Sequence, residues 1–320
     1  MKTIGVLTSG GDAPGMNAAV RAVVRTACEN GMKVYGINRG YAGLIEDDVR
    51  ELNIRSVSDI IHRGGTMLHS ARCKEFKEES GMKKAIATCR KYGIEGIVVI
   101  GGDGSFRGAR DLSLRGIPCI AIPGTIDNDI VSTDYTIGYD TCLNTIMQMV
   151  DRVRDTVESH SRCIVVEVMG NRCGDLTLNA GIAVGATAIV IPEISCDIEK
   201  HVIERIKRTQ KTDKKHFIVM VAEGIGGVEA LARKIEQECA VESRAIVLGH
   251  VQRGGSPTVR DRVVASQMGY YAVQKLIEGE SNRVIVLKDD KIVDYDIYEA
   301  LCMQKTVDDQ LYKVAHEISI

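Results

Sequence analysis

The chain has 320 residues, 44% of them hydrophobic, and its formal net charge is −2 with an isoelectric point of about 6.4. This length predicts about two domains with large buried cores. The near-neutral charge argues against bulk nucleic-acid binding, which usually shows a strongly basic domain. The longest apolar stretch, at 182–191, is too short to span a bilayer.

The N-terminal sequence MKTIGVLTSGG enters a strand-and-loop pattern directly, without the apolar region and cleavage site of a signal peptide. Ten cysteines are scattered through the chain with no CxxC pair. This usage indicates reduced thiols rather than a disulfide framework. Together these features predict a cytoplasmic protein.

Short aliphatic runs, each ending in glycine or a polar residue, recur along the chain and predict buried strands. In chain order they are Ile4–Leu7, Gly96–Ile100, Cys119–Ile122, Cys163–Val168, His216–Val221, Ala245–Leu248 and Arg283–Leu287. Segments with helical periodicity lie between most of them, at Met16–Glu29, Gly81–Tyr92, Thr141–Val157, Asp197–Thr209 and Val228–Glu238. This alternation predicts βαβ units and an α/β fold with mainly parallel sheets.

Three of the predicted strands are followed by glycine-rich loops that also carry a carboxylate. The loops read TSGGDAPG at 8–15, GGDGS at 101–105 and PGTIDND at 123–129. Ligands of open parallel sheets bind beyond the carboxyl ends of the strands, so we expect the loops to meet at one crevice. Glycines let backbone N–H groups approach an anion, and Asp103 or Asp129 can hold Mg²⁺. The pattern predicts a site for a polyphosphate with its metal.

Familiar nucleotide motifs do not account for these loops. Gly10-x4-Gly15 is followed by Met16-Asn17 instead of the Lys-Ser/Thr of a P-loop, and Arg107 stands where a dinucleotide fingerprint needs its third glycine. Cationic residues near predicted strand ends suit a second phosphate, carried by the acceptor, because arginine grips phosphate bidentately. These residues are Arg72, Arg162, Arg172, Arg244, His250 and Arg253. The alternative interpretation is that they are solvated surface residues and a structural histidine.

Five motifs in this order, GVLTSGGDAPGMNA, VVIGGDGS, PGTIDNDI, VVEVMG and GHVQRGGSP, resemble the bacterial ATP-dependent 6-phosphofructokinase family. The resemblance runs from about residue 2 to beyond residue 290. It implies transfer of the γ-phosphate of MgATP to the 1-hydroxyl of fructose 6-phosphate, the committed step of glycolysis. It also implies two Rossmann-like α/β/α sandwich domains. These are a larger ATP/Mg-binding domain, 1–138 plus 251–302, and a smaller fructose 6-phosphate-binding domain, 139–250 plus 303–320.

The resemblance also implies roles for individual residues. Asp127 would be the general base, Thr125 would orient the transferred group, and Arg72 would neutralise its charge. Asp103 and Asp129 would position Mg²⁺. The implied ATP contacts are Gly11, Tyr41, Arg72, Cys73, Gly102, Asp103, Gly104, Ser105 and Gly108. The implied sugar-phosphate contacts are Thr125, Asp127, Asp129, Met169, Gly170, Glu223, His250 and Arg253, joined by Arg162 and Arg244 from a neighbouring subunit of a homotetramer.

An effector site, with ADP as activator and phosphoenolpyruvate as inhibitor, is implied in the same way. Its residues are Arg21, Arg25, Asp59, Arg154, Gly185, Lys211, Lys214 and Lys215. Thr187 replaces a glutamate that helps to hold the effector's Mg²⁺ in the family, which puts ADP activation in question. Asn171 replaces a usual arginine beside the active site, and Arg172 follows it.

Two other functions stay open at this point: a pyrophosphate-dependent or different-sugar phosphotransferase, and a catalytically silent nucleotide-sensing subunit. Pyrophosphate-dependent relatives carry Asp and Lys where this chain has Gly104 and Gly124, so ATP is favoured as the donor. An acceptor such as tagatose 6-phosphate is not excluded. A catalytically silent nucleotide-sensing subunit would have lost its base or its metal carboxylates, whereas Asp103, Asp127 and Asp129 are all present.

Overall fold

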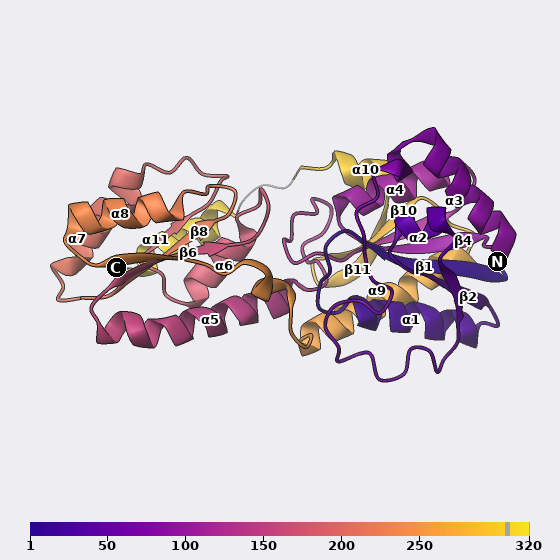
Figure 1. Cartoon of the computed structure of the whole chain (residues 1–320), viewed down its shortest axis with the longest axis horizontal. Coiled ribbons are helices and arrows are strands. Elements are labelled where there is room, and N and C mark those ends of the chain that lie inside the picture. The colour runs from indigo at the N-terminus through magenta and orange to yellow at the C-terminus, as the bar shows by residue number, and fades with distance from the viewer. Residues whose placement is uncertain (305–307, 320) are drawn as a thin grey trace. The chain divides into compact units, whose positions relative to one another are not determined.

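The chain folds around two separate β-sheets, one of seven strands and one of four, in the residues that the structure describes, 1–304 and 308–319. In this computed structural model each sheet forms the core of its own unit (Figure 1). The first unit combines Met1–Ile126, Ile130–Thr141 and residues 253–304; the second combines Asp127–Asp129, Cys142–Gln252 and the C-terminal helix. Both sheets are mainly parallel, which confirms the predicted α/β class.

The assignment of ATP and the sugar phosphate to separate domains, 1–138 plus 251–302 and 139–250 plus 303–320, stays a prediction. Residues 305–307 and 320 of the last range lie outside the described residues. Within those described, no helix is both long and apolar enough to cross a membrane.

The sheet of the first unit has a parallel centre and an antiparallel strand at each edge. Its order is β11 (Lys291–Asp296), β10 (Arg283–Lys288), β5 (Cys119–Pro123), β4 (Gly96–Gly101), β1 (Thr3–Ser9), β2 (Lys33–Ile37) and β3 (Val49–Leu52). Strands β3 and β11 are the antiparallel ones. Residues of β4 and β5 are buried throughout, as expected of parallel strands covered on both faces.

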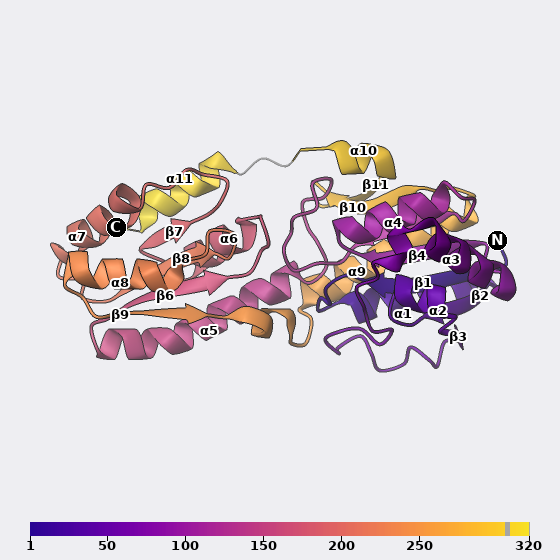
Figure 2. The ribbon, with the colours of Figure 1, turned by 45° about the horizontal axis from the view of Figure 1, so that its top comes forward.

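Helices cover both faces of this sheet (Figure 2). One face carries α1 (Met16–Glu29) and α9 (Val259–Ile277), and the other carries α3 (Glu79–Tyr92), α4 (Asp103–Ser113) and α10 (Ile297–Cys302). The short α2 (Tyr41–Glu46) and the 3₁₀ turn η1 (Glu75–Lys77) lie beside α3. Helices α1 and α9 pack closely because Gly269 has no side chain: a Cβ there would lie 2.8 Å from the carbonyl oxygen of Ala19.

The sheet of the second unit is parallel throughout, in the order β7 (Ala188–Val190), β8 (Phe217–Ala222), β6 (Cys163–Val168) and β9 (Ser243–Val247). The remaining helical elements are α5 (Tyr139–Ser159), α6 (Asp175–Ala183), the π-helical turn η2 (Glu199–Ile203), α7 (Glu204–Gln210), α8 (Val228–Cys239), the 3₁₀ turn η3 (Gly249–Arg253) and α11 (Asp309–Ile318). Residues of β6, β7 and β8 form one apolar cluster with η2, α7 and α8. That cluster is the core on one side of this sheet.

A fully buried carboxylate, Asp261 in the first turn of α9, organises the segment that leads into α5. It accepts hydrogen bonds from the Tyr135 hydroxyl at 2.6 Å, from the Gly138 amide at 2.7 Å, and from both the amide and the hydroxyl of Thr141. Thr258 caps α9 by accepting from the Asp261 amide, and its own amide donates to the Thr141 hydroxyl. Burial raises the pKa of Asp261, and the four donors oppose that shift. The carboxylate therefore ties residues 135–141 to α9.

Asp261→Asn is expected to lower the free energy of unfolding by about 2–4 kcal/mol, because an amide NH₂ would face donors where an oxygen now accepts. Urea unfolding measures this change. The matched control is Asp290→Asn, because the Asp290 side chain is 88% exposed. This substitution should change the free energy of unfolding by less than about 0.5 kcal/mol. Equal stability of the two variants would contradict the role given to Asp261.

Candidate active site

Three loops of the first unit begin at the same level of its sheet. Strand β1 pairs with β4 so that Ser9 lies opposite Gly101, and Gly101 lies opposite Pro123 of β5. The Ser105 hydroxyl donates to the carbonyl of Ser9 at 3.1 Å, and a Cβ on Gly10 would lie 3.6 Å from that hydroxyl oxygen. The loops after β1 and β4 are therefore in contact.

The first loop also receives residues from distant parts of the chain. The Ser70 hydroxyl donates to the Gly10 carbonyl, and Arg253 Nη1 donates to the Asp12 carbonyl at 3.4 Å. A side chain at Gly11 would collide with the Arg253 guanidinium. The missing side chain at position 11 thus leaves room for this cation to lie against the loop.

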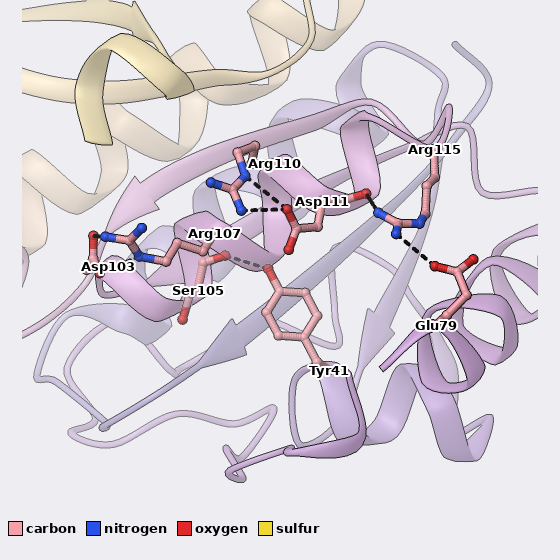
Figure 3. A network of polar contacts seen from close by, with 8 residues as sticks. All are labelled: Tyr41, Glu79, Asp103, Ser105, Arg107, Arg110, Asp111 and Arg115. Carbon is pink, nitrogen blue, oxygen red and sulfur yellow. Dashed lines mark hydrogen bonds and ion pairs between the residues drawn. The ribbon is translucent and has the colours of Figure 1, made fainter. Parts of the chain in front are cut away.

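The first turn of α4 is supported from below by Tyr41 (Figure 3). The buried Tyr41 hydroxyl donates to the Ser105 carbonyl at 2.6 Å, and its ring stacks on Phe76 with centroids 4.0 Å apart. A Cβ on Gly108 would lie 2.6 Å from the Tyr41 ring. Burial raises the pKa of Tyr41, so the phenol stays neutral. Phe76 is a part of this support that the sequence analysis did not identify.

Asp103, the first residue of α4, is half exposed, and the space beside Gly104 is open. Apart from its two chain neighbours and the backbone of its own helix, no heavy atom of the described residues lies within 4 Å of a Cβ built on Gly104. No group of three or more His, Cys, Asp or Glu within the described residues could hold a metal ion. Asp103 still fits Mg²⁺, which usually takes one or two protein carboxylates and completes its shell with water and phosphate oxygens.

The PGTIDND loop is held by polar contacts along its length. In the first unit, the Thr136 hydroxyl donates to the Thr125 carbonyl at 2.6 Å. In the second unit, the Asn128 amide donates to Asp175 at 2.6 Å, and Asn171 donates to Asp129 at 3.4 Å. Asn128 has a φ of 50°, a left-handed conformation that asparagine tolerates. The Thr125 and Asp127 side chains are buried, and Asp129 is half-buried.

In the second unit, the loops after β6, β8 and β9 are joined by two polar side chains. Glu223 accepts from the backbone amides of Gly170 and Asn171, at 3.1 and 2.6 Å. Gln252 is fully buried, accepts from the Met169 amide at 3.1 Å and donates to the Gly249 carbonyl at 2.9 Å. The predicted residues Met169, Gly170 and Glu223 are thereby brought together. Gln252 was not among them, although it lies inside the GHVQRGGSP motif between His250, which is exposed, and Arg253.

Arg162, which directly precedes β6, and Arg244 on the neighbouring strand β9 share one carboxylate. Residue 163 of β6 lies opposite residue 243 of β9. Arg162 Nε and Arg244 Nη2 contact the two oxygens of Glu242 at 2.8 and 2.7 Å. The hydrogen bond from Arg162 lowers the pKa of Glu242. Two guanidinium groups are thus held together at this edge of the sheet.

Arg72 is exposed, and the half-buried Cys73 packs against the core cluster beneath α3 and α4.

The predicted effector residues fall in two places. In the first unit, Arg21 and Arg25 lie half-buried on α1, where burial and the neighbouring Arg25 lower the pKa of Arg21, and Asp59 is exposed.

In the second unit, Arg154 donates to the Val184 carbonyl, next to Gly185. Burial and Arg154 lower the pKa of Lys214, which indicates that the two cations are close. Thr187 is buried and contributes no charge, and Lys211 and Lys215 are exposed.

Comparison with known proteins gives a consistent match. The phosphofructokinase family model matches residues 3–276. The ATP-dependent 6-phosphofructokinases of Clostridioides difficile (strain 630) and Bacillus subtilis (strain 168) are 56% and 54% identical to the chain over 320 residues, which is 100% of each protein. A phosphofructokinase structure from Saccharomyces cerevisiae superposes with a TM-score of 0.88 at 33% identity, covering 100% of this chain and 48% of that chain. The chain therefore spans about half the length of the yeast protein.

The two glycines of α4 provide a matched test of this geometry. Both substitutions to alanine gain up to about 1 kcal/mol of helix propensity. Gly104→Ala has room for its methyl group, so the free energy of unfolding should stay equal or rise. Gly108→Ala must displace the Tyr41 ring, which should lower the free energy of unfolding by about 1–3 kcal/mol. Chemical unfolding of both variants measures these changes. If Gly104→Ala were destabilised while Gly108→Ala kept its stability, the packing described here would be refuted.

Proposed function

The chain belongs to the phosphofructokinase family, and on that premise we propose that it is an ATP-dependent 6-phosphofructokinase. It transfers the γ-phosphate of ATP to the 1-hydroxyl of fructose 6-phosphate, giving fructose 1,6-bisphosphate and ADP in the committed step of glycolysis. The observation that carries this proposal is the full-length similarity to two bacterial enzymes of that name. Cytoplasmic location belongs to the same proposal, and the ten free cysteines suit a reducing compartment.

The surroundings of two glycines support ATP rather than pyrophosphate as the donor. The open space beside Gly104 leaves room for a nucleotide, and an acidic side chain there would repel its phosphates. At Gly124, a Cβ would lie 3.1 Å from both Ile100 and Met16, so a lysine at that position would have to displace them. Both positions therefore suit a nucleotide site.

Asp127 is the proposed general base, taking the proton from the sugar 1-hydroxyl as its oxygen attacks the γ-phosphorus. The buried Thr125 and Asp127 support this role, because electrostatic interactions are stronger where bulk water is excluded. In phosphoryl transfer the protein acts by positioning and by neutralising charge. Thr125 orients the transferred group, and the exposed Arg72 supplies the cation that neutralises it.

The nucleotide is held by the residues around the loops after β1 and β4. The proposed ATP contacts are Gly11, Tyr41, Arg72, Cys73, Gly102, Asp103, Gly104, Ser105 and Gly108. Tyr41 also positions the first turn of α4, since its hydroxyl donates to the carbonyl of Ser105. Asp103 and Asp129 are the carboxylates proposed to hold Mg²⁺, which when bound neutralises phosphate oxygens.

The sugar phosphate is proposed to bind Met169, Gly170, Glu223, His250 and Arg253, with Arg162 and Arg244 supplied by a neighbouring subunit of a homotetramer. The pair held by Glu242 supports this role, because two adjacent guanidiniums match the oxygens of one phosphate. Both side chains are partly exposed, so a phosphate from another subunit can reach them.

Asp127→Ser is expected to lower kcat by about 10²–10⁴-fold, the usual contribution of a general base, while substrate binding persists. The measurement is a steady-state assay with fructose 6-phosphate and Mg²⁺, run with ATP and with pyrophosphate. Asp290→Ser, at an exposed position, is the control. A fall of less than tenfold would overturn Asp127 as the base. Wild-type turnover with pyrophosphate would overturn the donor, and none with either donor would favour another acceptor or a silent subunit.

Regulation at the second site is proposed to be one-sided, with phosphoenolpyruvate inhibiting and ADP failing to activate, since the buried Thr187 offers no carboxylate for an effector's Mg²⁺. The residues Arg21, Arg25, Asp59, Arg154, Gly185, Lys211, Lys214 and Lys215 form this proposed site. The cations Arg154 and Lys214 support anion binding, because burial and the nearby Arg154 lower the pKa of Lys214, and an arriving anion would favour its charged form.

Lys214→Met is expected to raise the concentration of phosphoenolpyruvate needed for half-inhibition about tenfold, as one charge-assisted contact is lost. Initial rates at subsaturating fructose 6-phosphate, with and without each effector, provide the measurement. Lys200→Met, at an exposed position of the same unit, should leave inhibition unchanged. Inhibition that persists in Lys214→Met, or activation of the wild type by ADP, would contradict this view of regulation.

A further inference from the structure

The first two turns of α4 carry an ion pair that no role above explains. Arg107 contacts Asp103 through two bonds, Nε to Oδ2 at 2.9 Å and Nη2 to Oδ1 at 3.3 Å. Figure 3 shows the Arg107 side chain extending back along the helix toward its N-terminus. The cation therefore lies next to a carboxylate proposed to hold Mg²⁺.

The pair lies where the nucleotide phosphates are proposed to bind. Asp103 follows the carboxyl end of β4, between Gly102 and Gly104. Among the described residues, a Cβ on Gly104 would meet no atom within 4 Å beyond its chain neighbours and its own helix backbone. The helix N-terminus at this point favours negative charge. A polyphosphate in that space would be within the reach of a long, flexible arginine.

Arg107 and Asp103 form a solvent-exposed pair that is free to exchange partners. The two side chains are 53% and 51% exposed, and an exposed pair spaced i, i+4 on a helix is weak. A polyphosphate offers several charged oxygens, which an arginine grips bidentately. If Asp103 turns to Mg²⁺, Arg107 loses most of the attraction of its partner and can contact a phosphate instead.

We propose that Arg107 is a nucleotide-binding residue that exchanges Asp103 for the polyphosphate when MgATP binds. The proposal rests on the function proposed above and adds a specific cation to that site. In the free protein Arg107 keeps the carboxylate neutralised and ordered; in the complex it contacts the phosphates. It therefore supports binding of both metal-free ATP and MgATP.

Equilibrium binding of a non-hydrolysable ATP analogue with a β,γ-imido bridge tests this exchange, once with Mg²⁺ and once with EDTA. Arg107→Met should raise Kd about tenfold with Mg²⁺, the loss of one charge-assisted contact. The factor should be larger with EDTA, because Asp103 then faces the phosphates without any cation. Arg107→Lys, which keeps the charge, should lose less than Arg107→Met in both conditions.

Arg110→Met is the matched control, since Arg110 lies on the same helix and pairs with Asp111 at 2.8 Å. It should bind the analogue like the wild type, and the unfolding transition of each variant reports that it folds. A Kd for Arg107→Met equal to or below that of the wild type with Mg²⁺ would overturn the proposal and leave Arg107 a surface pair. If the wild type binds no analogue and turns over no ATP, the proposed function itself fails, and Arg107 with it.

Discussion

The candidate site depends on the parallel register of β1, β4 and β5. Backbone hydrogen bonding sets Ser9 opposite Gly101 and Gly101 opposite Pro123, so three loops begin at one level of the sheet. Side chains on both faces of these strands are buried, and a slip of one residue would move every side chain to the opposite face. The packing that stabilises the sheet thereby also fixes the height at which Gly10, Gly102 and Gly124 present their backbone.

Glycine serves opposite purposes within this arrangement. At Gly11 and Gly108 it permits close approach, by the Arg253 guanidinium in one case and by the Tyr41 ring in the other. At Gly104 the neighbouring space is open among the described residues, so packing gives no reason for the missing side chain. A glycine that its neighbours do not require in the free protein is readily understood if a ligand occupies that space. The first two support the candidate site, and the third leaves open the space that the nucleotide is proposed to occupy.

The sequence predicted the parts of the fold that continuous aliphatic runs create. All seven predicted strands are present, although β9 spans Ser243–Val247 rather than Ala245–Leu248. The missed strands include the edges β3 (VREL) and β11 (KIVDYD), whose polar residues face water and break the apolar pattern. Helix α4 was missed because its two glycines weaken the helical signal. Contacts such as Gln252 with Met169, or Phe76 on Tyr41, join residues distant in sequence, and no local pattern encodes them.

Burial separates the ionic groups of this protein into fixed and exchangeable ones. Asp261 is fully buried and accepts from four donors. If its carboxylate were drawn away by another partner, these four buried donors would be left unpaired. Glu242 and Asp103 hold their arginines at partly exposed positions, where water screens the attraction. Such a pair orders a guanidinium without binding it strongly. A phosphate group carries more negative charge than a carboxylate and therefore attracts the guanidinium more. In the exchange proposed for Arg107, an arriving phosphate displaces such a carboxylate at little cost, and weak pairs would suit a site whose ligands must also leave.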